Sequence, residues 1–238
     1  MKYYINVILC IFLLSRCGNT TNKREYEDLC VKMPEELFDH FLQEKELTRG
    51  QYIVFFRVFK KEELFEVWTK KQNEDFVLSV SFPFCKNSGV LGPKRKEGDF
   101  QIPEGIYSID RYNPKSKFHL SLGINYPNSV DLIHADQNKP GGDIFIHGGC
   151  ASIGCISITN ESIDLVYRLA KNSASPYSIE AHFFPFKFNN IDFMNELKAQ
   201  NPDTKLLWNS LESIYTSFEK NRQLPEVHMS EGEYLLTN

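Results

Sequence analysis

Apolar and polar positions alternate through the first half of the chain in a way that predicts strands. The segment YIVFFRVFKKEELFEVWTK, which starts at Tyr52, reads as a hairpin with a charged turn over 60–63. Further apolar runs bounded by turn residues predict strands over 76–82, 106–109, 118–122 and 144–146. The middle of the chain is therefore expected to be rich in β-structure.

Apolar residues at helical spacing flank this region. Pro34 is placed to open a helix whose apolar face includes Phe38 and Leu42. On the other side, Asn160 is placed to cap a helix over 163–170. The pattern therefore predicts a helix before the strands and another after them.

The last quarter of the chain shows two more amphipathic segments. They cover 191–197 and 206–218, and Asp203 is a plausible cap for the second. We expect this helical tail to cover an edge of the sheet, with a lid over a substrate cleft as the functional alternative.

Residues 1–17, MKYYINVILCIFLLSRC, have the pattern of an export signal. Lys2 precedes an apolar stretch from Ile5 to Leu14 that is too short to span a bilayer. The run LSRC resembles a bacterial lipobox, although Arg16 departs from the small residue preferred before the cysteine. We expect export to the periplasm or cell envelope, and lipidation of Cys17, which would anchor the protein to the membrane, is an open alternative.

Composition narrows the class of protein. The 238 residues are 42% hydrophobic and 24% charged, which suits one domain with extensions. The net charge of −4 gives no electrostatic footprint for nucleic acid. No Gly-rich strand-to-helix phosphate loop is present, which disfavours a doubly wound nucleotide fold. Short strands between helices indicate an α+β fold.

Two residues able to carry acyl-transfer chemistry stand close together in IFIHGGCASIGCISITN, residues 144–160. Cys155 offers a thiol, which is a nucleophile only as thiolate, and His147 is the nearest base that could remove its proton. This division of roles requires no metal and no organic cofactor.

Glycines surround these two residues. A carbonyl from Gly148 or Gly149 could hold the histidine nitrogen that does not face sulfur. The amides of Gly154 and Cys155 are candidates for an oxyanion hole. The stretch therefore predicts a cysteine nucleophile with a histidine base.

This motif resembles that of the L,D-transpeptidase catalytic domain, the YkuD family, and in particular its YafK-like branch. The family carries an Ile-His-Gly strand end followed by Ser-His-Gly-Cys-(apolar)-Arg, and this chain has IHG at 146–148 and SIGCIS at 152–157. Ile153 replaces the second histidine of the family and Ser157 replaces its arginine. Four other segments are similar to the family or to that branch: LGPKRKEGDFQIPEGIYSI (91–109), FHLSLGINYPNSVD (118–131), HFFPFKF (182–188) and FEKNRQLPEV (218–227).

The resemblance implies a YkuD-type β-sandwich or barrel-like core with flanking helices and a helical C-terminal extension. It divides the chain into four parts: an export signal over 1–17, a linker and N-terminal helix over 18–46, a catalytic domain over 47–186, and the extension over 187–238.

The resemblance also implies the chemistry and the partner. Cys155 would attack peptidoglycan stem peptides, and an amine would then resolve the thioester to give a crosslink or a protein attachment. Ser152, Ser157 and His134 are candidates for substrate contact, with solvation of His134 as its simpler interpretation. The basic run at 94–96 reads as a solvated loop or as an edge that meets anionic cell-wall polymer.

Three alternative functions stay open. Water could resolve the thioester, which would make the protein an L,D-carboxypeptidase or an amidase that detaches a peptidoglycan-bound lipoprotein. The protein could instead be a non-catalytic cell-wall binding module. The third alternative is a zinc protein built on His147, Cys150 and Cys155, which would lack a nearby fourth ligand.

The remaining cysteines give no clear framework. Cys150 reads as a packing residue, with a redox or metal role as the alternatives, and Cys30 and Cys85 could form a pair. The connectivity cannot be deduced from the spacing.

Overall fold

The structure, a computed structural model, describes residues 33–200 and 202–237. The predicted export signal, Cys17 and Cys30 lie outside these residues. Within them, no helix is both long and apolar enough to cross a membrane.

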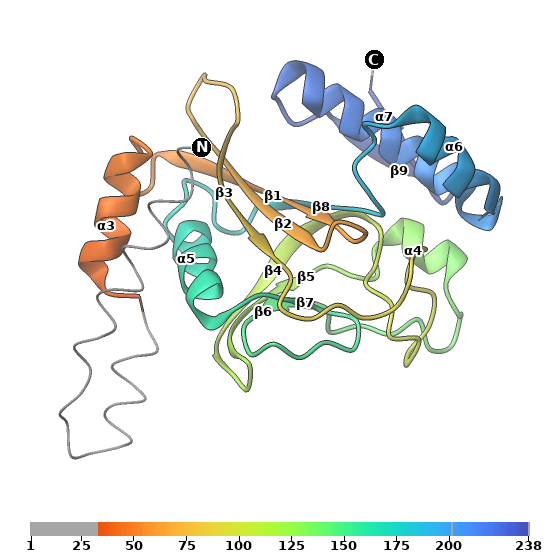
Figure 1. Cartoon of the computed structure of the whole chain (residues 1–238), viewed down its shortest axis with the longest axis horizontal. Coiled ribbons are helices and arrows are strands. Elements are labelled where there is room, and N and C mark those ends of the chain that lie inside the picture. The colour runs from red at the N-terminus through yellow and green to blue at the C-terminus, as the bar shows by residue number, and fades with distance from the viewer. Residues whose placement is uncertain (1–32, 201, 238) are drawn as a thin grey trace.

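One curled eight-stranded mixed sheet forms the centre of the molecule (Figure 1). Its order is β3-β2-β1-β8-β4-β5-β6-β7, with β1 parallel to β8 and β6 parallel to β7. The strands are β1 (Tyr52–Phe59), β2 (Leu64–Lys71), β3 (Val77–Pro83), β4 (Gly105–Ser116), β5 (His119–Ile124), β6 (Phe145–His147), β7 (Ile156–Ser157) and β8 (Glu180–Phe184). The predicted hairpin over 52–71 is confirmed as β1 and β2, because Tyr52 pairs with Lys71 and Phe59 with Leu64.

Helices lie on two sides of the sheet, and the last two come from the C-terminal part of the chain. In Figure 1, α3 and α5 lie at the left, and α6 and α7 lie at the upper right above β8. The helices are α3 (Glu35–Glu44), α4 (Ser129–His134), α5 (Asn160–Lys171), α6 (Ile191–Gln200) and α7 (Lys205–Asn221), with a 3-10 turn η2 (Pro202–Thr204) between the last two. The fold is therefore α+β, as the sequence predicted.

The C-terminal extension packs on a face of the sheet, whereas the sequence pattern suggested an edge. Tyr215 of α7 contacts the rings of Phe59 and Phe184, with centroids 6.1 and 5.6 Å away, and Phe218 lies 5.0 Å from Phe55. These partners belong to β1 and β8, which are interior strands, while the edges are β3 and β7. Large buried aromatic side chains on an interior face make α7 part of the core.

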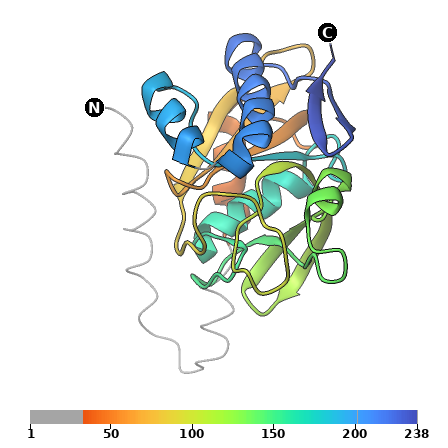
Figure 2. The ribbon, with the colours of Figure 1, turned by 90° about the vertical axis from the view of Figure 1, so that its right-hand side faces the viewer.

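The chain ends in a hairpin that the sequence pattern did not predict. Strands β9 (Val227–Ser230) and β10 (Glu233–Leu236) pair only with each other. Figure 2 shows the hairpin beside α7 and close to α4. Buried Tyr234 fixes its position, because its hydroxyl accepts from the Asn128 side chain at 2.8 Å.

Two helix details differ from the sequence predictions. Thr159, rather than Asn160, caps α5 by accepting from the amide of Ser162 at 3.3 Å. His134, for which the sequence pattern predicted no helix, is the last residue of α4. That helix begins with a capping box in which Asn128 and Asp131 satisfy each other's backbone amides.

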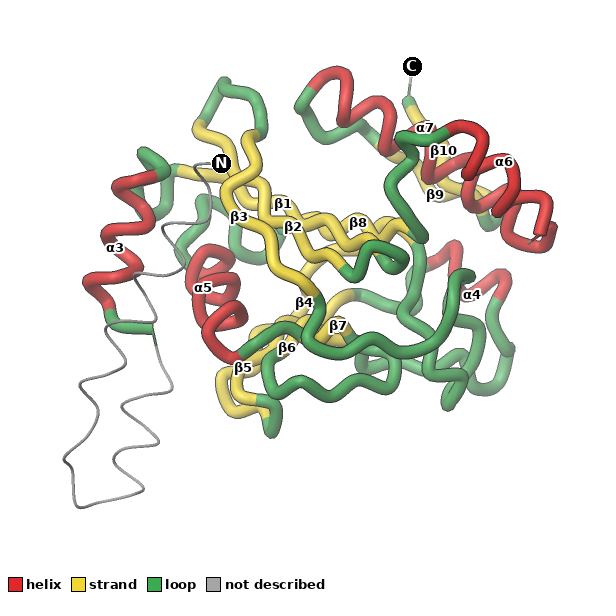
Figure 3. Tube along the Cα trace, viewed as in Figure 1, coloured by secondary structure: helices red, strands yellow, loops and turns green. Residues whose placement is uncertain are grey.

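Two long irregular segments converge beside the edge strand β7. Figure 3 shows the connection from β3 to β4 and the connection from β6 to β7 as loops along this part of the sheet. Lys86, in the first of them, forms an isolated bridge with Ser157 of β7. The candidate site is built where these loops meet the sheet.

Candidate functional site

Strand register brings the predicted nucleophile and base to one face of the sheet. In the parallel pair β6–β7, Ile146 lies opposite Ile156 and His147 opposite Ser157. Cys155 comes directly before the paired residues of β7 and lies beside Phe145. The amide N of Phe145 is 3.4 Å from the Sγ of Cys155. Because side chains alternate along a strand, His147 and Cys155 share a face, while Ile146 and Ile156 enter the core on the other.

Cys155 is a partly buried free thiol. The Phe145 amide donates to the sulfur, and the S–H points to the carbonyl of Asp143 at 3.8 Å. Burial raises the pKa of the Cys155 thiol above its ordinary value of 9.0, while the Phe145 amide and the Lys94 ammonium offset part of that rise. The resting form is therefore the protonated thiol, which needs a base before it can attack.

His147 is held in the form that a base requires. Its Nδ1 lies 2.5 Å from the carbonyl oxygen of Gly148, so this nitrogen carries the proton and Nε2 keeps its lone pair. Burial lowers the pKa of His147 below its ordinary value of 6.5, and the Gly148 contact opposes that shift only in part. The ring of Phe118 covers the imidazole, with centroids 4.8 Å apart.

The loop between β6 and β7 depends on glycine at two positions. At Gly148 a Cβ would lie 2.6 Å from the Asn160 side-chain oxygen, which already accepts from the amide of Gly149 at 2.9 Å. Gly154 has φ of +127°, and a Cβ there would lie 3.1 Å from the carbonyl of Gln101. Both positions therefore exclude larger residues.

The amide of Gly154 already has a partner. It donates to the hydroxyl of Ser152 at 3.3 Å, and that hydroxyl donates in turn to the carbonyl of Cys155 at 2.7 Å. Ser152 thus organises the turn before the candidate nucleophile, and its oxygen also lies 2.9 Å from that of Ser88.

Two further predicted contact residues are engaged within the protein. Ser157 is fully buried, and its hydroxyl bonds both the amide and the carbonyl of Lys86, so no surface of it faces solvent. His134 lies at the end of α4, where its Nε2 is 3.0 Å from the carbonyl of Gly232 in the C-terminal hairpin.

The cysteine connectivity corrects the sequence interpretation. Cys85 forms a disulfide with Cys150, so the suggested pair of Cys30 with Cys85 is wrong, and Cys150 is not a packing residue. The sequence could not show this because 65 residues separate the partners. A cysteine in a disulfide has no thiolate to give a metal, so the zinc alternative loses one of its three ligands.

The residues of the basic run at 94–96 have different environments in the structure. Lys94 is 4% exposed, and its ammonium donates to Asp99 at 2.6 Å and to the carbonyl of Lys96 at 2.9 Å. Lys96 is exposed. The interpretation as a wholly solvated loop is therefore wrong for Lys94, which lies close enough to Cys155 to influence its pKa.

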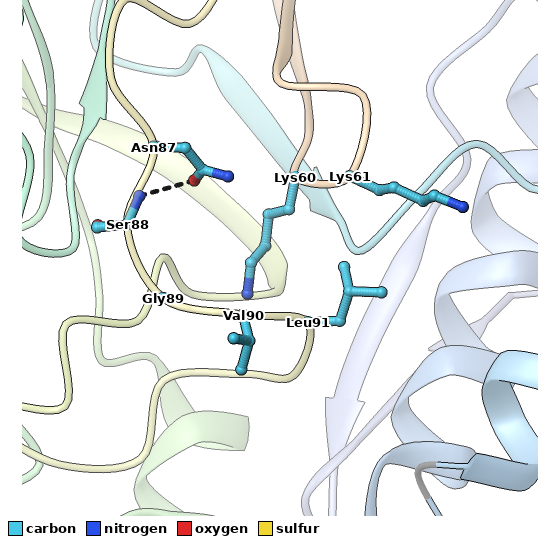
Figure 4. A pocket seen from close by; sticks show the side chains of 7 residues that line it. All are labelled: Lys60, Lys61, Asn87, Ser88, Gly89, Val90 and Leu91. Atoms are coloured by element: carbon cyan, nitrogen blue, oxygen red, sulfur yellow. Dashed lines mark hydrogen bonds between the residues drawn. The ribbon is translucent and has the colours of Figure 1, made fainter.

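One cavity of about 180 Å³ lies behind the loop that follows β3 (Figure 4). Its lining includes neither Cys155 nor His147: Lys60, Lys61, Asn87, Ser88, Gly89, Val90 and Leu91. The ammonium of Lys60 is buried and satisfied by Glu104 at 2.9 Å and by two carbonyls, so it is part of the framework. The geometry of the thiol and the imidazole defines the candidate site better than this cavity does.

A thiol and an oriented imidazole on one sheet face, at the end of a glycine-bearing loop, are the arrangement of a cysteine acyl-transfer site. Comparison of the sequence with protein families agrees with this class. The L,D-transpeptidase catalytic domain (YkuD) matches residues 54–179, which include both His147 and Cys155. The chain belongs to the L,D-transpeptidase catalytic domain family.

The chain is also similar to individual proteins. The Escherichia coli K12 protein named "Putative L,D-transpeptidase YafK" is 33% identical over 188 residues, covering 77% of this chain and 74% of that protein. Among solved structures, the helical cell shape determining protein Pgp2 of Campylobacter jejuni has a TM-score of 0.47 and 17% identity, covering 82% of this chain and 80% of Pgp2. Bd1075 of Bdellovibrio bacteriovorus has a TM-score of 0.42 and 17% identity, covering 77% of this chain and 83% of Bd1075.

Proposed function

We propose that this protein is an exported cysteine acyltransferase that acts on peptidoglycan stem peptides. The observation that carries the proposal is the presence, on one face of the sheet, of a free thiol at Cys155 and of an imidazole at His147 whose Nδ1 is fixed by a carbonyl. Membership of the L,D-transpeptidase catalytic domain family supports the substrate class.

The proposed reaction has two half-reactions. His147 Nε2 takes the thiol proton while the Cys155 sulfur attacks the amide carbonyl next to the L-configured centre of the third stem-peptide residue, commonly diaminopimelate. The C–N bond breaks, the leaving amine takes the proton from the imidazolium, and a thioester remains. An acceptor amine then attacks the thioester, its proton passes through His147 to the sulfur, and the new amide is released.

Hydrolysis is the second candidate outcome. Ser157 stands where the family motif has arginine, and its hydroxyl is bonded to the backbone of Lys86. Loss of that cation is compatible with different handling of the acyl group, so water could replace the amine. The products would be those of a carboxypeptidase or of an amidase that detaches a peptidoglycan-bound lipoprotein.

The test compares wild type with Cys155→Ala on purified sacculi, with muropeptides identified by mass spectrometry. Crosslinked, trimmed and detached products differ in mass, so one experiment separates transfer from hydrolysis. Intact-protein mass spectrometry after incubation with a carbapenem should show an adduct on wild type that is absent from Cys155→Ala. Retention on peptidoglycan without product or adduct would instead indicate a binding module, and activity of Cys155→Ala equal to wild type would refute the proposal.

A further inference from the structure

A row of neighbouring residues crosses β4, β5 and β6 and ends at the candidate nucleophile, which directly precedes β7. In the antiparallel pairs, Arg111 of β4 lies opposite Gly123 of β5, and Gly123 lies opposite Phe145 of β6. Phe145 in turn lies beside Cys155. Residues that are directly opposite in a sheet project to the same face, so the Arg111 side chain and the thiol share one face.

Gly123 leaves the space through which Arg111 reaches toward the site. A Cβ at Gly123 would lie 2.8 Å from Arg111 Nε, so the arginine side chain passes over the glycine backbone. Its guanidinium then lies above the ring of Phe145, with Cζ 4.9 Å from the ring centroid. Cation–π contact with Phe145 thus holds the guanidinium one strand away from Cys155.

The charge on Arg111 is accessible to a ligand. The side chain is 43% exposed and donates to Asp143 at 2.7 Å and to Asp110 at 3.0 Å. Asp143 is itself 81% exposed. An ion pair between such exposed groups contributes little to stability, so a ligand carboxylate could take the place of Asp143 at small cost.

Lys94, the cation that lowers the pKa of the Cys155 thiol, is not available to a ligand in this way. It is buried, and it is held by Asp99 and by a backbone carbonyl. Arg111 also offers a planar fork of donors that matches a carboxylate with two parallel hydrogen bonds, which an ammonium cannot provide.

We propose that Arg111, supported by Phe145, forms a subsite that binds a carboxylate of the peptide whose carbonyl Cys155 attacks. The inference rests on the proposed function and adds a specificity-determining residue to it. Two carboxylates of a stem peptide have the required chemistry, the one on the D-centre of the third residue and the one at the C-terminus. The experiment below distinguishes them.

Binding is measured by calorimetry on Cys155→Ala, so that no turnover interferes. The probes are a stem tetrapeptide, the same peptide amidated at the D-centre, and the same peptide amidated at its C-terminus. Adding Arg111→Gln should raise the Kd of the free peptide about 10-fold to 100-fold, the range for a hydrogen bond to a charged group. One of the two amidated peptides should bind with a similarly raised Kd when Arg111 is present. Its Kd should not rise further when Arg111→Gln is added.

Matched variants show whether binding depends on the position of the Arg111 guanidinium or only on the net charge of the protein. Lys115→Gln removes an exposed cation from the same strand and should leave the Kd unchanged. Arg111→Lys keeps the charge but loses the planar fork, so its Kd should be intermediate. Gly123→Ala keeps Arg111 but displaces its side chain, and it should weaken binding of the same carboxylate.

The outcomes distinguish this inference from the proposed function. If wild type processes the peptides and Arg111→Gln processes free and amidated peptides as well as wild type does, Arg111 is not a subsite, although the function stands. If wild type does not process the peptides and Cys155→Ala does not bind them, the proposed function fails and the inference fails with it. Loss of discrimination at one carboxylate supports the subsite.

Discussion

The imidazole of His147 donates from Nδ1 to the carbonyl oxygen of the next residue, Gly148, at 2.5 Å. This bond leaves Nε2 as the basic nitrogen, on the sheet face shared with Cys155. No distant carboxylate is needed to fix the ring, because the turn after β6 supplies the acceptor. The proposed base is therefore positioned by backbone geometry.

Removal of this base should be far more costly than removal of the other candidate histidine. A positioned general base contributes about 100-fold to 10,000-fold, so His147→Ala should lower kcat/KM by that amount. His134→Ala should change it by less than about 2-fold, because the ring of His134 bonds to the carbonyl of Gly232 in the C-terminal hairpin and is not the proposed base. Equal losses in the two variants would remove His147 from the mechanism.

Activity should persist at mildly acidic pH. His147 must be neutral to accept a proton, and burial holds its pKa below 6.5, so kcat/KM should fall only as the pH drops below that value. Phe118→Ala exposes the ring, which should raise the His147 pKa and move the acidic limb of the pH–rate profile upward. Phe100→Ala, which removes another exposed aromatic side chain, should leave that limb in place.

The disulfide should stabilise the protein and the loop before the proposed nucleophile. It closes a separation of 65 residues, for which chain entropy predicts a contribution of about 4 kcal/mol. The double variant Cys85→Ser/Cys150→Ser should therefore lower the free energy of unfolding measured in urea by about 2 to 4 kcal/mol.

The effect on activity is tested with the same double variant. Hydrogen bonds of Ser152 with Ser88 and of Ser157 with Lys86 remain, so activity at low temperature should be reduced rather than abolished. An unchanged unfolding free energy and unchanged activity together would show that the disulfide is dispensable.

Asp131 should make stability depend on pH. Burial raises the pKa of this carboxyl from 3.8 to about 6, so the folded state holds the proton over a range in which the unfolded chain has lost it. The free energy of unfolding should therefore fall as pH rises from about 4 to 6. Asp131→Asn cannot titrate, and it should gain roughly 2 to 3 kcal/mol relative to wild type between pH 4 and pH 8. The measurement is urea denaturation at both pH values, with the exposed Asp136→Asn as the control. The prediction is contradicted if the free energy of unfolding of each variant differs from that of wild type by the same amount at both pH values.

Local patterns were enough to predict most of the elements around the site. The hairpin of β1 and β2, the strand before His147 and the helix after Cys155 follow from apolar periodicity and turn residues, which are properties of short segments. The motif with His147 and Cys155 also lies within one short stretch, so the sequence alone identified both residues as candidates and the Gly148 carbonyl as a contact.

Tertiary structure decided everything that depends on pairing between distant segments. The bond between Cys85 and Cys150 depends on how the loop after β3 lies beside β7. Arg111 shares a sheet face with Cys155 because a register shift between Ile109 and Arg111 sets its alignment with Gly123, and no periodicity along one strand encodes that alignment. The sequence by itself therefore determined the candidate reactive groups and their local supports. The three-dimensional packing of strands and loops decided which distant side chains surround them, because contacts between segments far apart in the chain leave no local pattern.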